Sequence, residues 1–205
     1  MQIPFQRKKI SIYYDSKTYA PTSHTTLLFI NTVRVTSSDQ TGAMIGVGSG
    51  LDAIALVLKG LRKVIATDID PHSLSIAKQN VEANKVKGVI EVRKGSLFDP
   101  LSDVKKNGGI DVLYVSPPCM PIPPDQINQF PSSVNGGPDR TKYLEIALKR
   151  HLIICTKSEG DCILILHQRL TRKNFSNCWI RITPGKNWHE LKCLFQSSFC
   201  LSGPS

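Results

Sequence analysis

The sequence predicts an α/β fold in which a mostly parallel sheet has helices on both faces and an antiparallel edge hairpin at the C-terminus. From residue 42, short apolar runs alternate with longer helical patterns, and strands separated by helical crossovers pair in parallel. The chain has 205 residues, of which 40% are hydrophobic, which suffices for one sizeable core. We therefore expect residues 1–40 to form a lead-in that packs on the core and residues 41–205 to form a single domain.

The individual elements follow from local patterns. Short apolar runs predict strands at 43–47, 63–70, 88–95, 110–115 and 161–168. A run that is apolar nearly all round predicts a packed helix over 51–61. Asp70 and Pro71 resemble an N-cap followed by the first helical residue, which places a second helix over about 71–84.

The ends of the chain give weaker patterns. The lead-in is expected to be irregular, with one short helix near 23–33. An amphipathic pattern predicts a third helix over 139–155. The segments 178–184 and 190–199 are expected to pair as the two arms of the edge hairpin.

The net charge of +10 comes from 26 basic and 16 acidic residues. It suits a nucleic-acid partner drawn in by the field of the protein, and it equally suits a solvated basic surface. No apolar run approaches the roughly 18 residues of a membrane span, and no secretory signal is visible. Six cysteines lack any C-x-x-C or metal-ligand spacing, so we expect reduced thiols, no bound metal and a cytoplasmic location.

The stretch "GVGSG" combines Gly46, Gly48 and Gly50 between the first predicted strand and helix. Glycines let the backbone turn tightly and let a ligand approach it, although a plain tight turn has the same composition. Asp68 follows at the end of the next strand, where an open parallel sheet binds its ligands. A carboxylate there can accept hydrogen bonds from both hydroxyls of a ribose, while Asp70 serves as the helix cap.

Two further strand ends reach the same edge. The stretch "KGSLFD" brings Ser96, Leu97 and Phe98 near the place of an adenine ring, with Phe98 equally suited to the core. The fourth strand runs into Ser116-Pro117-Pro118-Cys119. Two prolines fix the backbone in an extended form without N–H donors, so this stiff corner either stops the strand or presents its carbonyl groups to a substrate.

These motifs resemble the class I S-adenosylmethionine-dependent methyltransferases that modify planar nitrogen, which have a Rossmann-like sheet. The stretches "YAPTSHTTLL" (19–28) and "GGPDRTKYLEIAL" (136–148) are similar to segments of the HemK-like protein glutamine methyltransferases. The resemblance spans roughly residues 13–168. Four motifs in the right order make it more specific than any one of them.

The resemblance implies S-adenosyl-L-methionine as cofactor and a division of roles. The catalytic corner is implied to be Ser116, Pro117, Pro118 and Cys119, with the serine side chain and the Pro117 carbonyl accepting hydrogen bonds from the substrate NH₂ group. The residues implied to bind the cofactor are Gly46, Gly48, Gly50, Asp68, Ser96, Leu97 and Thr25. The family has asparagine and an aromatic residue where this chain has Ser116 and Cys119, and an acidic residue is usual at Met44.

Three hypotheses for function stay open. The first is methylation of a protein glutamine amide, by analogy in a translation release factor, with a small zinc-binding activator protein as a further partner. The second is methylation of an exocyclic base amine in RNA or DNA, which the charge of +10 favours. The third is a catalytically impaired methyltransferase-like subunit, suggested by Met44, Ser116 and Cys119.

Overall fold

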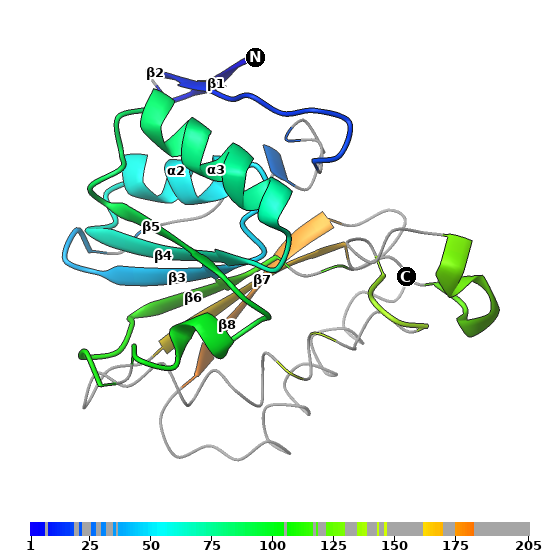
Figure 1. Cartoon of the computed structure of the whole chain (residues 1–205). Coiled ribbons are helices and arrows are strands. Elements are labelled where there is room, and N and C mark those ends of the chain that lie inside the picture. The colour runs from blue at the N-terminus through cyan, green and yellow to red at the C-terminus, as the bar shows by residue number, and fades with distance from the viewer. Residues whose placement is uncertain are drawn as a thin grey trace, which may run out of the picture.

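The computed structural model describes most of the first two thirds of the chain and two strands beyond it. The described residues are 1–6, 8–18, 21, 26–27, 30–31, 35, 37–104, 106–116, 118, 122–129, 135–138, 143 and 146, with the backbone of 162–169 and 175–182. Figure 1 shows a central sheet with helices packed over one of its faces and a small hairpin beyond them.

The central sheet has six strands in the order β5-β4-β3-β6-β7-β8. The bounds are β3 Thr41–Ile45, β4 Lys63–Asp68, β5 Ile90–Lys94, β6 Val112–Val115, β7 Cys162–Arg169 and β8 Phe175–Ile182. The first five run parallel, and β8 pairs antiparallel with β7. The strand order reverses at β3, which has β4 on one side and β6 on the other. This is the position at which open α/β sheets bind ligands.

The predicted mostly parallel α/β fold is confirmed, and the antiparallel edge differs in its pairing. Strand β8 pairs along its whole length with β7, from Cys162 opposite Ile182 to Arg169 opposite Phe175. The edge hairpin is therefore formed by β7 and β8, because a short connection favours antiparallel pairing of consecutive strands. The second predicted arm, 190–199, lies outside the described residues.

Helices α2 (Leu51–Leu58) and α3 (Pro71–Ala83) lie side by side on one face of the sheet (Figure 1). The first six residues of α2 are all buried, as its apolar sequence predicts. Asp70 caps α3 by accepting hydrogen bonds from the N–H groups of His72 and Ser73. Of the helix predicted over 139–155, residues 143 and 146 are described and both are helical.

The lead-in is more regular than predicted, because it begins with an antiparallel hairpin of β1 (Gln2–Phe5) and β2 (Lys8–Ser11). Ile3, Phe5, Ile10 and Ile12 are buried and belong to the same hydrophobic core as α2 and α3. Alternation of buried and exposed residues in β1 is the strand pattern that the sequence carried. Residues 26, 27, 30 and 31 are helical, within the short helix predicted near 23–33.

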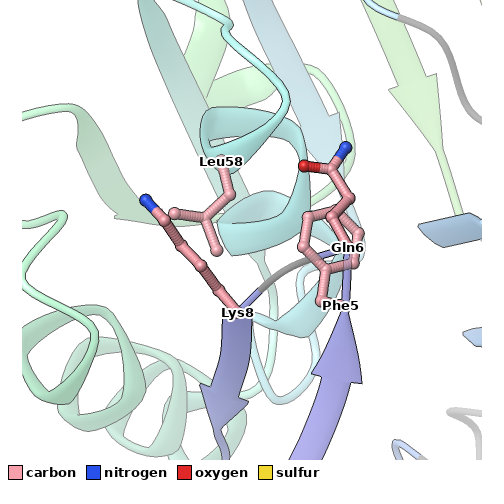
Figure 2. A pocket seen from close by; sticks show the side chains of 4 residues that line it. All are labelled: Phe5, Gln6, Lys8 and Leu58. Carbon is pink, nitrogen blue, oxygen red and sulfur yellow. The ribbon is translucent and has the colours of Figure 1, made fainter.

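A pocket of about 440 Å³ lies between this hairpin and the C-terminal end of α2, lined by Phe5, Gln6, Lys8 and Leu58. Figure 2 shows the four side chains around it. Helix α2 begins at the glycine turn and rises about 1.5 Å per residue, so the pocket is about a helix length away from that turn. It is therefore separate from the ligand edge of the sheet.

Two short 3₁₀ helices, Asp99–Leu101 and Pro124–Gln129, complete the described elements. No helix among the described residues is long and apolar enough to cross a membrane.

Shortening a side chain between α2 and the sheet should destabilise the fold. Ile54 is fully buried in the core, and we expect Ile54→Ala to lower the free energy of unfolding by about 3 kcal/mol, because it leaves a cavity. Denaturant unfolding followed by circular dichroism measures this. The control is Ile127→Ala, at a side chain that is 45% exposed; an equal loss in both variants would contradict the assigned core.

Candidate functional site

The glycine turn is held against the end of β4 by backbone hydrogen bonds. The N–H groups of Gly46 and Val47 both donate to the carbonyl oxygen of Thr67, at 2.9 and 3.0 Å. The N–H of Gly48 donates to Oδ2 of Asp68 at 3.0 Å. These three bonds fix the path of the chain between β3 and α2 at the carboxyl edge of the sheet.

Gly46 also lies against the end of β6. Its φ of +81° is left-handed, and a Cβ added there would lie 2.4 Å from the carbonyl oxygen of Ser116. In the same place the N–H of Ser116 donates to the carbonyl of Ile45 at 2.9 Å. A glycine is required here because any side chain would clash with backbone. The contact brings the start of the proline corner to the glycine turn.

Gly48 differs from Gly46 because its surroundings are open. It has φ of +52°, and nothing lies within 4 Å of the Cβ position. The turn therefore presents bare backbone on this side, beside the Asp68 carboxylate. Such an open, glycine-lined surface is what the close approach of a ligand to the backbone needs.

Asp68 lies at the carboxyl edge as predicted, and it also has a structural role. Oδ2 accepts from Gly48 N–H, and Oδ1 accepts from the N–H of Asp70 at 3.1 Å. An ionised carboxylate has about four lone-pair sites, so capacity remains for two hydroxyl donors. The half-buried Asp68 thus fits the ribose of a nucleoside cofactor while its carboxylate is held in place by backbone amides.

Ile69, which follows Asp68 directly, is not among the predicted site residues. Its side chain is 66% exposed, the largest exposure among the large hydrophobic side chains described. An exposed isoleucine next to the carboxylate expected to bind ribose suits the flat apolar face of an adenine ring. The signal was present in the sequence as an apolar residue between two aspartates, but its exposure depends on where β4 ends.

The turn after β5 starts beside Asp68, because the N–H of Gly95 donates to the Asp68 carbonyl at 3.0 Å. Ser96 is exposed and Leu97 is half-buried with a left-handed φ of +46°. The structure therefore brings both predicted residues to the edge that carries Asp68. Phe98 is buried at 4% exposure, so its side chain belongs to the core and does not face a ligand.

The remaining predicted site residues divide into two groups. Ser116 and Pro118 are described and half-buried. Pro117, Cys119 and Thr25 lie outside the described residues. Met44, at the position where an acidic residue is usual in the family it resembles, is buried in the hydrophobic core.

One carboxyl group at this end of the sheet is deeply buried. Asp52 lies in the first turn of α2, immediately after the glycine turn. Burial raises the pKa of Asp52 to about 7, because removal from water disfavours the charged form. The protonation of this group is therefore coupled to folding in the neutral and mildly acidic range.

Sequence comparison identifies related proteins. A family model described as "Ribosomal protein L11 methyltransferase (PrmA)" matches residues 20–114. A protein of Methanocaldococcus jannaschii named "Putative protein N5-glutamine methyltransferase MJ0928" is 31% identical over 167 residues, covering 79% of this chain and 78% of that protein. The "Ribosomal protein L11 methyltransferase" of Alkaliphilus oremlandii is 37% identical over 83 residues, covering 40% of this chain and 26% of that protein. The match thus spans well under two thirds of the latter relative.

Solved structures share the fold. Precorrin-6y C5,15-methyltransferase from Geobacter metallireducens has a TM-score of 0.50 at 15% identity, covering 78% of this chain and 69% of that chain. The precorrin 8w decarboxylase of Methanobacterium thermoautotrophicum also has a TM-score of 0.50, at 16% identity, covering 75% of this chain and 68% of that chain. These likenesses show a shared α/β architecture.

A methyl group on the open side of the glycine turn should block the cofactor and leave the fold intact. We expect Gly48→Ala to weaken binding of S-adenosylhomocysteine about tenfold or more, because the new Cβ occupies the side where backbone is exposed. Its left-handed φ costs about 1–2 kcal/mol of stability. Isothermal titration calorimetry measures the affinity. Gly88→Ala is the control, since nothing lies within 4 Å of its Cβ position, and equal affinities in both variants would refute the assigned surface.

The buried carboxyl predicts a pH dependence of stability. The pKa of Asp52 is 3.8 in the unfolded reference and about 7 in the folded protein, so between these values the native state keeps a proton that the unfolded state has lost. The contribution of this group to the free energy of unfolding therefore falls as pH rises from about 4 to 7. We expect Tm to drop less between about pH 4 and pH 7 in Asp52→Asn than in wild type, by a difference of about 5 °C or more. Exposed Asp125→Asn is the control; identical pH profiles for wild type and Asp52→Asn would contradict the assignment.

The site and the comparisons agree on the class of enzyme. The glycine turn, Asp68 and Ile69 form an edge that fits a nucleoside cofactor, and they lie at the switch point of the sheet. A relative of 31% identity is matched over more than three quarters of both chains, so the likeness extends well beyond this edge. The chain belongs to the class I S-adenosylmethionine-dependent methyltransferases, and its cofactor is S-adenosyl-L-methionine.

Proposed function

We propose that this enzyme transfers a methyl group to the side-chain amide nitrogen of a glutamine in a protein. The observation that carries the proposal is the contact between Gly46 and the carbonyl of Ser116. The first residue of the proline corner lies beside the glycine turn, at which we propose that the cofactor binds. An acceptor nitrogen held at that corner lies next to the methyl donor.

The start of the corner suits a planar amide because Ser116 is held by a backbone contact. Ser116 is anchored through its N–H to Ile45, and its hydroxyl oxygen can accept a hydrogen bond from an NH₂ group. In the proposed mechanism the carbonyl of Pro117 accepts the second N–H. Two acceptors fix the plane of the amide, so that its nitrogen faces the methyl group in line.

The cofactor supplies an electrophilic methyl group on a sulfonium sulfur. With the cofactor held at the glycine turn and Asp68, the glutamine nitrogen would form the N–C bond as the C–S bond breaks with its electron pair left on sulfur. The nitrogen would then lose one proton to solvent. The acceptors at Ser116 and Pro117 favour the developing positive charge on nitrogen, since hydrogen bonds to charged donors are stronger than neutral ones.

The relatives support this substrate class to different extents. The match to the L11 family model ends at residue 114, before the proline corner, so it concerns mainly the cofactor half. The match to MJ0928 covers 79% of a 205-residue chain, and a continuous stretch of that length must include Ser116. Ribosomal protein L11 methyltransferases of Listeria are matched over 61% of this chain, and a continuous stretch of that length must include Ser116 as well. The support for a glutamine substrate therefore comes from the name of MJ0928, since the matched range is shared by both substrate classes.

We further propose the partners that this chemistry needs. The substrate would present its glutamine on an exposed loop, as in a translation release factor, because the side chain must reach the strand ends. A small zinc-binding protein is proposed as an activator. Methylation of an exocyclic base amine in RNA or DNA is the competing hypothesis, and the net charge of +10 favours it.

The proposal predicts methylation of a glutamine-containing loop peptide but not of the same peptide with glutamate. The chain would be incubated with methyl-labelled S-adenosylmethionine and either peptide, alone and with a zinc-binding activator. Mass spectrometry locates the added methyl group. We expect Ser116→Ala to lower kcat about tenfold or more while cofactor affinity changes by about twofold at most.

Asp68→Ala is the control for cofactor loss, because it removes both the ribose acceptors and the bond to Gly48. A parallel reaction contains transfer RNA and ribosomal RNA in place of peptide. Label in RNA alone would replace the glutamine proposal by the base-amine hypothesis. Cofactor binding without transfer to peptide, release factor or RNA would refute the proposed activity in favour of a methyltransferase-like subunit.

A further inference from the structure

One buried side chain on α3 connects two separate parts of the molecule. Asn80 is 1% exposed. Its Oδ1 accepts a hydrogen bond from the N–H of Tyr13 at 2.7 Å, and its Nδ2 donates to the carbonyl of Tyr13 at 2.8 Å. The same Nδ2 donates to the carbonyl of Ser49, also at 2.8 Å. A single amide group therefore holds both the N-terminal segment and the glycine turn.

Asn84, one helical turn further along, makes a comparable contact with the N-terminal segment. Its Oδ1 accepts from the N–H of Ser11 at 3.0 Å, and its Nδ2 donates to the carbonyl of Ser11 at 2.7 Å. Residues four apart share one face of a helix, and alternate residues of an extended segment face the same way. The second hydrogen bond of Asn84 Nδ2 goes to the carbonyl of Asn80, within the helix. Only Asn80 of this pair reaches the glycine turn.

The extended segment is also fixed at the start of α3. Nε2 of His72 lies 2.8 Å from Oδ2 of Asp15. Ser11, Tyr13 and Asp15 thus follow α3 from its C-terminal end towards its N-terminus. Figure 1 shows this segment running from β2 beside the helix. Tyr13 is consequently held from both sides in the position where it contacts Asn80.

The contact with Ser49 holds the glycine turn from the side of α3, in addition to the hydrogen bonds that Gly46, Val47 and Gly48 make to the end of β4. Ser49 is buried, and a buried carbonyl without a donor costs free energy. Helix α3 also packs closely on the turn, since Cα of Ala77 lies 3.3 Å from the Cβ position of Gly50. The two hydrogen bonds between Asn80 and the backbone of Tyr13 orient the Asn80 amide, so that its remaining N–H group donates to the carbonyl of Ser49.

We propose that Asn80 is a positioning residue for cofactor binding. It fixes the glycine turn through the Ser49 carbonyl, and the backbone of Tyr13 holds its amide in the required orientation. The N-terminal segment and the cofactor site are in this way ordered by one side chain. The proposal concerns the cofactor site and does not depend on the identity of the methyl acceptor.

The matched substitutions Asn80→Asp and Asn84→Asp test this inference in the full chain. Each substitution keeps the shape of the side chain and its acceptor oxygen, and removes its NH₂ donor. Asn80→Asp loses the hydrogen bonds donated to the carbonyls of Tyr13 and Ser49. Asn84→Asp loses those donated to the carbonyls of Ser11 and Asn80. Binding of S-adenosylhomocysteine is measured by calorimetry. Amide hydrogen exchange of a peptide covering 46–50 is measured without any cofactor.

We expect Asn80→Asp to weaken binding about tenfold and to speed exchange in 46–50. Asn84→Asp should change affinity by about twofold at most and leave that exchange as in wild type. Equal effects of both substitutions on binding and on exchange would overturn the proposal. If the carboxylate of Asn80→Asp prevents folding, Asn80→Ala replaces it, since alanine removes the same donors without adding charge; unchanged exchange in that variant would overturn the proposal as well.

Discussion

The fixed path of the glycine turn along the end of β4 is the constraint on which the site depends. Three backbone N–H groups, of Gly46, Val47 and Gly48, are bonded to Thr67 and Asp68. These bonds determine where α2 begins and which part of the turn is open. They also hold the Asp68 carboxylate at the edge, because one of its oxygens is itself a partner of the turn. The groups predicted to bind the cofactor therefore also fix the local fold.

The parallel order of the sheet also brings the end of β6 to this turn. Strand β3 lies between β4 and β6, so the chain leaving β3 contacts the ends of both neighbours. On the β4 side it contacts Asp68, and on the β6 side Gly46 lies against Ser116. A cofactor bound on the β4 side and a substrate bound on the β6 side would therefore lie next to each other at the glycine turn. This arrangement is a consequence of the reversal of strand order at β3.

Besides β4 and β6, helix α3 also contacts the glycine turn and stabilises it. Its first turn is capped by Asp70, its middle packs on Gly50 through Ala77, and Asn80 bonds to Ser49. The helix also carries the N-terminal segment, whose preceding hairpin contributes buried residues to the core. The lead-in is thus integrated with the core and with the cofactor edge by hydrogen bonds to side chains as well as by apolar packing.

Much of the fold could be predicted from the sequence alone, because its signals are local. Apolar runs, the Asp70-Pro71 cap and the three glycines identify β3, β4, α2 and α3 correctly, and the position of Asp68 at the end of β4 follows from the same pattern. Such features depend on residues within one or two turns of the chain. The same local pattern identified the proline corner and left its function open.

The tertiary structure alone decided which distant groups meet. Asn80 resembles an ordinary helical residue in sequence, and its bonds to Tyr13 and Ser49 span 67 and 31 residues. The exposure of Ile69 and the burial of Asp52 also depend on the packing of distant segments. No pattern within a short window encodes these contacts, because they arise only when the packed sheet and helices bring separate segments together.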